Sequence, residues 1–65
     1  MVKLHDLERH LRDHGCVPLR EGAKHSIWLN PSTGRRTAVP RHRELPPTTA
    51  RAICAQLGIP PIGAK

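Results

Sequence analysis

Glycines and prolines interrupt this chain at short intervals, and their positions constrain its fold more than any other feature. Gly15 follows the first apolar repeat, residues 30–34 read Asn-Pro-Ser-Thr-Gly, and Pro46-Pro47 precedes the last apolar repeat. Proline lacks a backbone N–H and glycine favours turns, so regular structure does not continue through these points. The chain must therefore fold from short helices and short strands.

Apolar residues recur at helical spacing near both ends of the chain. We predict a helix over residues 3–14 and a second that opens at Pro47 or Thr48, with Gly15 and Gly58 as left-handed C-terminal stops. The two apolar stripes consist of Leu4, Leu7 and Leu11 in the first helix and Ala50, Ile53, Cys54 and Leu57 in the second.

Three segments between the helices have the composition of β-strands. We predict strands over residues 16–20, 25–29 and 35–39, joined by short turns. Pro18 places the first strand at a sheet edge or at a bulge, because proline cannot donate to a ladder. The order α-β-β-β-α predicts an α+β fold, with a three-stranded antiparallel sheet and both helices on one face.

The length of the chain limits it to one small domain. It has 65 residues, with one Trp and no Phe or Tyr, so Leu, Ile, Val and Ala must supply most of the core. A domain of this size buries only about 60% of the surface of its unfolded chain. We expect a single domain over residues 1–65, an ordered core over about 2–58, a short tail over 59–65 and no cofactor.

The charge of the chain is strongly positive and unevenly distributed. Lys and Arg number 11 against 5 acids, for a net charge of +6, and most of the excess lies in residues 34–65. This balance predicts a partner with dense negative charge, either nucleic acid or an acidic protein. No apolar run approaches the ~20 residues of a membrane span and no signal region is evident, so we expect a cytoplasmic protein.

Cysteines and N-terminal histidines offer no recognisable metal or disulfide pattern. Cys16 and Cys54 are far apart and lack a Cys-x-x-Cys motif, which is typical of two buried thiols in a reduced protein. His5, His10 and His14 lie on the first predicted helix, but no further ligand completes a set. We expect no metal.

Four arginines lie close together in the second half of the chain. Arg35 and Arg36 begin the third predicted strand, and Arg41 and Arg43 follow its end. Guanidinium groups bind phosphates through paired hydrogen bonds, so the group is a candidate RNA contact. The alternative is a solvated basic surface without a ligand.

Two histidines lie beside these cations. His25 follows Lys24 at a predicted turn, and His42 stands between two of the arginines. Histidine changes protonation near neutral pH, so His25 can take the proton of an RNA 2′-hydroxyl, while Lys24 stabilises charge on the phosphate. His42 is a second acid, a base or a phosphate contact. By spacing alone, a plain surface role for His25 is favoured over a catalytic one, and the residues do not assign the role of His42.

Trp28 is the only aromatic residue, and strict alternation leaves its direction open. It shares a strand face with Ser26, whereas His25, Ile27 and Leu29 share the other. If the aliphatic pair points to the core, Trp28 is free to stack on a base but His25 turns inward. Packing in the core is the alternative role for Trp28.

Several runs together resemble one family. They are His14-Gly15-Cys16, residues 19–28 (Leu-Arg-Glu-Gly-Ala-Lys-His-Ser-Ile-Trp) and residues 36–42 (Arg-Thr-Ala-Val-Pro-Arg-His). They are similar to the HicA (YcfA-like) mRNA interferase toxins of type II toxin–antitoxin systems, and the resemblance extends over roughly residues 2–58. It implies a fold like that of double-stranded-RNA-binding domains. It also implies metal-independent cleavage of mRNA by a histidine that falls on His25, and a HicB-type antitoxin that covers the active face.

Two further functions compete with an endoribonuclease toxin. A non-catalytic RNA-binding module would use the same basic face, and would retard RNA without cutting it. A protein-binding domain would pair its basic surface with an acidic partner instead. Cleavage of RNA without metal separates the first reading from the second, and nucleic-acid binding at low salt separates both from the third.

Overall fold

The computed structural model describes residues 1–63, so Ala64 and Lys65 of the expected tail lie outside the described residues. Its elements, in chain order, are β1 (Val2–Lys3), α1 (Leu4–Asp13), β2 (Val17–Glu21), β3 (His25–Asn30), β4 (Arg35–Pro40), β5 (Glu44–Leu45) and α2 (Pro47–Leu57). Both predicted helices and all three predicted strands are present, with bounds shifted by a residue or so. The predicted α+β fold is confirmed.

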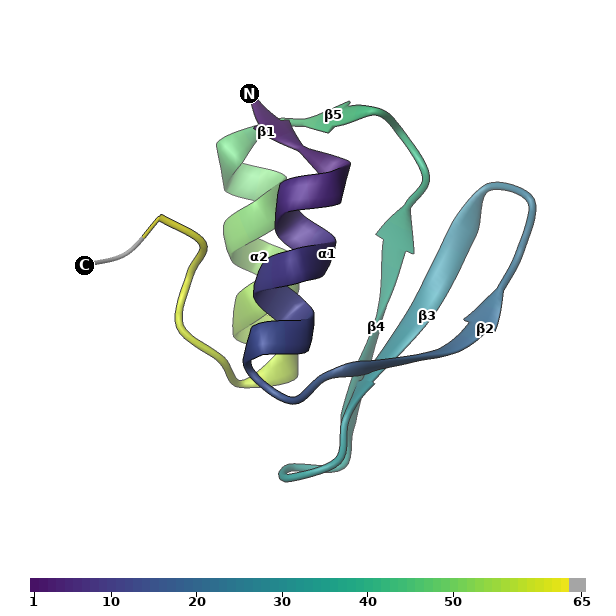
Figure 1. Cartoon of the computed structure of the whole chain (residues 1–65), viewed down its shortest axis with the longest axis vertical. Helices are drawn as coiled ribbons and strands as arrows, with labels where there is room; N and C mark the ends of the chain where they lie inside the picture. Colours follow the sequence, from purple (N-terminus) through teal and green to yellow (C-terminus); the bar gives the residue numbers. More distant parts are fainter. Residues whose placement is uncertain (64–65) are drawn as a thin grey trace.

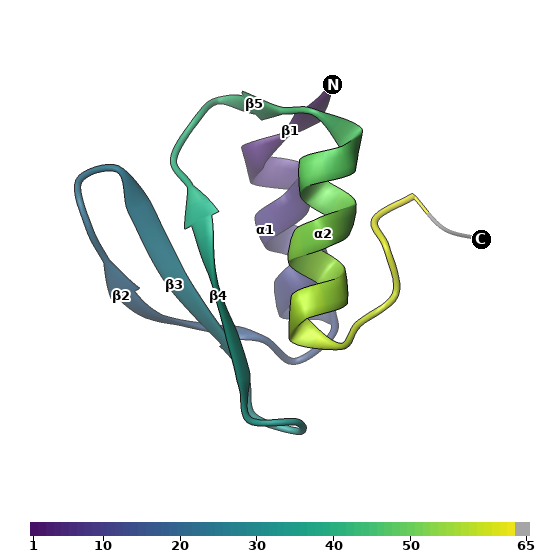
Figure 2. The ribbon, with the colours of Figure 1, turned by 180° about the vertical axis from the view of Figure 1, so that it is seen from behind.

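The main sheet is antiparallel, in the order β2-β3-β4, and both helices lie on one side of it (Figures 1 and 2). The pairing of β2 with β3 shifts register between Pro18 and Arg20. Pro18 therefore lies on an edge strand at an irregularity, as the missing N–H of proline requires. The other face of the sheet, which we call the open face, carries neither helix.

A second, two-stranded sheet pairs the N-terminal residues of the chain with the segment before α2, and it was not predicted. β1 pairs with β5, with Val2 opposite Leu45, and the Leu4 amide donates to the Arg43 carbonyl at 2.9 Å. Strands of two residues are too short to show periodicity, so they could not be predicted from the pattern of apolar residues. Their effect is to place the N-terminus of α1 beside the segment that leads into α2.

The core lies between the sheet and the two helices. Its buried side chains are Leu7 and Leu11 of α1, Cys16, Trp28 and Val39 near or on the sheet, Leu45 of β5, and Ala50, Ile53, Cys54 and Leu57 of α2. Gly58 ends α2 at a φ of 73°, in the left-handed region that glycine adopts without strain. Beyond it, Ile59 and Ile62 pack against the core, and His10 Nε2 donates to the Pro60 carbonyl at 2.7 Å. This part of the expected tail is docked.

The direction of β3 corrects one sequence expectation. Ser26, Trp28 and Asn30 face the helices and are buried, whereas His25, Ile27 and Leu29 face the open side. Trp28 is only 1% exposed, with the Arg12 guanidinium 5.4 Å from its ring centroid on the helix side. The hypothesis that Trp28 stacks on RNA is therefore wrong, because the largest apolar side chain fills the core in place of the two aliphatic ones.

Asn30 fastens the β3–β4 turn to the end of α2. It is 3% exposed, its Nδ2 donates to the Leu57 carbonyl at 2.7 Å, and its Oδ1 accepts from the Ser32 amide at 3.1 Å. Asn30→Ala should lower the free energy of unfolding by about 1–3 kcal/mol, because it removes both bonds from a buried position. Denaturant unfolding measures the loss. Asn30→Asp should cost more than Asn30→Ala, since it turns a carboxylate oxygen towards the Leu57 carbonyl, and equal stability of Asp and Asn would contradict this role.

Candidate functional site

His25 lies at the first position of β3, on the open face of the sheet. It pairs with Pro40 across the β3–β4 ladder, and its side chain is exposed. The two large aliphatic residues of the same strand face share this direction, which the strand period of two requires. The burial of Trp28 is thus what turns His25 outward.

A tight turn precedes His25 and holds it by backbone hydrogen bonds. The Gly22 amide donates to the His25 carbonyl at 2.8 Å, which leaves Ala23 and Lys24 as the turn residues. A Cβ on Gly22 would lie 3.0 Å from the His25 carbonyl oxygen, so the close approach of the two strands favours glycine here. Arg41 extends the β3–β4 pairing, because its amide donates to the Lys24 carbonyl at 3.0 Å.

These segments enclose a small hollow, which we call the histidine hollow. It has a volume of about 390 Å³ and is lined by Ala23, Lys24, His25, Arg41 and His42. The lining contains two imidazoles, an ammonium and a guanidinium, and no carboxylate. Such a set attracts a phosphate and supplies two imidazoles, the side chain most often used as a general acid or base.

The four predicted arginines do not meet at one place. Only Arg41 lines the histidine hollow. Arg36 lies opposite Leu29 on the open face, at the other end of β4 from the histidine hollow. Arg35 faces the helix side, where its Cδ lies 3.7 Å from the position of a Cβ built on Gly58, so its charge lies at the C-terminus of α2.

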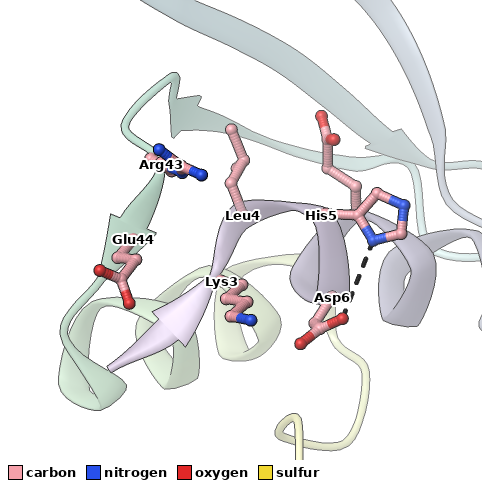
Figure 3. Close-up of a pocket in the computed structure, with 7 residues that line it drawn as sticks. Lys3, Leu4, His5, Asp6, Arg43 and Glu44 are labelled. Atoms are coloured by element: carbon pink, nitrogen blue, oxygen red, sulfur yellow. Dashed lines mark ion pairs between the residues drawn. The ribbon is translucent and has the colours of Figure 1, made fainter.

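Arg43 lines a different and larger hollow, shown in Figure 3. This hollow has a volume of about 750 Å³ and lies between β1, the start of α1 and β5. Its lining residues are Lys3, Leu4, His5, Asp6, Glu8, Arg43 and Glu44. The lining contains three carboxylates and two permanent cations, so a polyanion is repelled here at least as strongly as it is attracted. The larger hollow is therefore the poorer phosphate site.

The open face beside the histidine hollow is partly apolar. Ile27 and Leu29 are half-buried, and Val17 and Leu19 of the edge strand are 42% and 50% exposed. Arg20 lies opposite Ile27 and adds a cation to this face that the sequence analysis did not count. The register shift after Pro18 decides which face Arg20 joins, and no sequence signal gave its position.

The two thiols and the other histidines lie apart from this chemistry. Cys16 and Cys54 are free and buried as predicted, and burial raises the pKa of both thiols, so they stay protonated at neutral pH. The His10 and His14 rings meet edge to face on α1, with centroids 4.6 Å apart. Across residues 1–63, no three His, Cys, Asp or Glu side chains are grouped to hold a metal ion.

Neither helix within residues 1–63 has the length and apolar character that crossing a membrane requires.

Comparison with known proteins gives one match. The family model described as HicA toxin of bacterial toxin–antitoxin systems matches residues 5–59, which include both helices, the main sheet and the histidine hollow. No curated protein and no solved structure matches the chain. Because the match extends over most of the 65 residues, the chain belongs to the HicA toxin family of bacterial toxin–antitoxin systems.

Proposed function

We propose that this toxin is a metal-independent endoribonuclease that binds and cleaves mRNA in the cytoplasm, with His25 as its acid/base. The observation that carries the proposal is the histidine hollow, where His25 and His42 lie with Lys24 and Arg41 and without a carboxylate. Family membership supports a toxic activity, and the excess of positive charge supports a polyanionic substrate.

The chemistry follows from the lining groups. His25 takes the proton of a 2′-hydroxyl, and the oxygen so activated attacks the neighbouring phosphorus. The bond from phosphorus to the 5′-oxygen breaks, and His42 in its protonated form supplies the proton that this leaving oxygen takes up. Lys24 and Arg41 stabilise the charge that develops on the phosphoryl oxygens. The products are a 2′,3′-cyclic phosphate and a 5′-hydroxyl, so DNA is not a substrate.

The experiment that tests the proposal is incubation of the purified protein with a long single-stranded RNA in excess EDTA. The matching DNA runs alongside, together with RNA that carries 2′-deoxy residues at the cut positions. Cleavage of the unmodified RNA alone supports the proposal. RNA that is bound and retarded but left intact would instead favour a non-catalytic RNA-binding module on the same basic face.

Of the three predicted arginines outside the hollow, Arg36 is the strongest candidate for a remote phosphate contact. It lies on the open face, whereas Arg35 lies at the C-terminus of α2 and Arg43 beside carboxylates. Arg36→Ala should weaken RNA binding and reduce the slope of log K against log salt by about 0.7, the value for one lost contact to a single strand. Fluorescence anisotropy over a salt series measures both. Arg51→Ala on α2 is the charge-matched control, and an equal change in slope there would contradict a specific contact.

HicA toxins pair with antitoxins, and a HicB-type antitoxin is the proposed partner here. The open face supports this part of the proposal, because Ile27 and Leu29 share this face of β3 with His25, and the exposed Val17 lies opposite Leu29. A protein seated on these side chains would bury apolar surface and close the histidine hollow at the same time. Such a partner would inhibit cleavage by covering His25.

A further inference from the structure

Arg41 contacts both corners of the turn that precedes His25. Its backbone amide donates to the Lys24 carbonyl at 3.0 Å, and its guanidinium Nη1 donates to the Gly22 carbonyl at 3.0 Å. The first bond continues the β3–β4 register by one residue, and the second crosses the turn to the end of β2. One residue thus joins the ends of three strands.

The turn has little else to hold it. Gly22, Ala23, Lys24 and His25 are all exposed, so none of them is fixed by burial in the core. The bond from the Gly22 amide to the His25 carbonyl closes the turn from within. An unburied turn of this kind opens at low free-energy cost unless further bonds restrain it.

We propose that Arg41 is a positioning residue, which holds the turn so that the His25 imidazole stays directed into the histidine hollow. This inference rests on the proposed endoribonuclease function. A guanidinium has five N–H donors, so the bond to Gly22 leaves others to face a phosphate in the same hollow. The role is distinct from a charge contact, because it acts through the turn and exists before RNA binds.

The kinetic test separates a role in the catalytic step from ground-state phosphate binding, and the exchange measurement below separates positioning from stabilisation of the developing charge. Arg41→Ala should lower kcat at saturating RNA on the order of tenfold, because a general base held loosely is out of reach of its proton for much of the time. KM should change much less than kcat, and Arg41→Lys, which keeps one donor and the charge, should restore most of the loss. Arg51→Ala controls for the loss of one positive charge, and circular dichroism melts of each variant check that it folds.

A second measurement needs no RNA. Hydrogen exchange of the Gly22 amide, followed by NMR, should be faster in Arg41→Ala than in the parent and unchanged in Arg51→Ala. Gly22→Ala disturbs the same turn through the His25 carbonyl, so its kinetic effect should not add to that of Arg41→Ala in the double variant.

The outcomes are distinguishable. A raised KM with unchanged kcat, or unchanged Gly22 exchange in Arg41→Ala, overturns the positioning role and leaves Arg41 as a phosphate contact. If the parent protein cuts no RNA, the proposed function fails and the contribution of Arg41 to cleavage falls with it. Faster Gly22 exchange would then show only that Arg41 holds the turn.

Discussion

Replacing His25 with alanine is expected to slow RNA cleavage by about 10²–10⁴-fold, the usual contribution of a positioned general acid or base. The side chain is exposed at the start of β3, and the Gly22 bond to this residue uses its backbone carbonyl. The variant should therefore fold and bind RNA as the parent does. Cleavage of a labelled RNA in EDTA measures the rate, and anisotropy measures the binding.

A histidine outside the histidine hollow provides the matched control for His25. His14 is exposed at the C-terminal end of α1, immediately after the helix, where its ring contacts that of His10, and it does not line the hollow. His14→Ala should cleave RNA at the parental rate. If His25→Ala cleaved as fast as His14→Ala, the assignment of His25 as the acid/base would be lost, whatever the protein binds.

Trp28→Ala should be the most destabilising substitution in the core, with a loss of about 3–5 kcal/mol in the free energy of unfolding. A domain of this length has a total of only about 3–10 kcal/mol, at 0.05–0.15 kcal/mol per residue. The variant is therefore expected to be largely unfolded or close to it at 37 °C. Thermal unfolding followed by circular dichroism measures the change.

Trp28→Phe should cost far less than Trp28→Ala. The indole Nε1 is buried and has no hydrogen-bond partner within residues 1–63, so phenylalanine breaks no bond that the fold makes there. An aromatic ring also keeps the contact with the Arg12 guanidinium. Equal destabilisation by Phe and Ala would mean that the indole nitrogen contributes to stability in a way this packing does not explain.

Both helices and the three strands of the main sheet could be predicted because each carries a local signal. The stripe through Leu4, Leu7 and Leu11, the left-handed stop at Gly58 and the edge position of Pro18 all depend on residues a few positions apart. The family and the position of His25 followed from short runs of sequence in the same way. Whether His25 acts in catalysis stays a prediction.

The sequence did not determine which face of each strand lies against the helices, and therefore which side chains are buried and which reach the open face. Alternation is compatible with two arrangements of β3, and only packing against the helices selects the one that buries Trp28 and turns Ile27 to the open face. The arginines separated for a related reason, since neighbours in sequence, such as Arg35 and Arg36, face opposite sides of a strand. The position of Arg20 on the open face could not be predicted either, because it depends on the register shift between Pro18 and Arg20.

The five residues that line the histidine hollow lie outside the core, and four of them lie in the turn before β3 or just after the end of β4. Under the proposed function, a single base change in one of these codons removes the activity and leaves the buried core unchanged. The resulting chain would keep Ile27 and Leu29 on its open face. Under the proposed function, such an inactive toxin still binds the antitoxin and lowers the amount that is free to inhibit active toxin. A cell that carries an inactivated toxin gene therefore differs from a cell that has lost the gene.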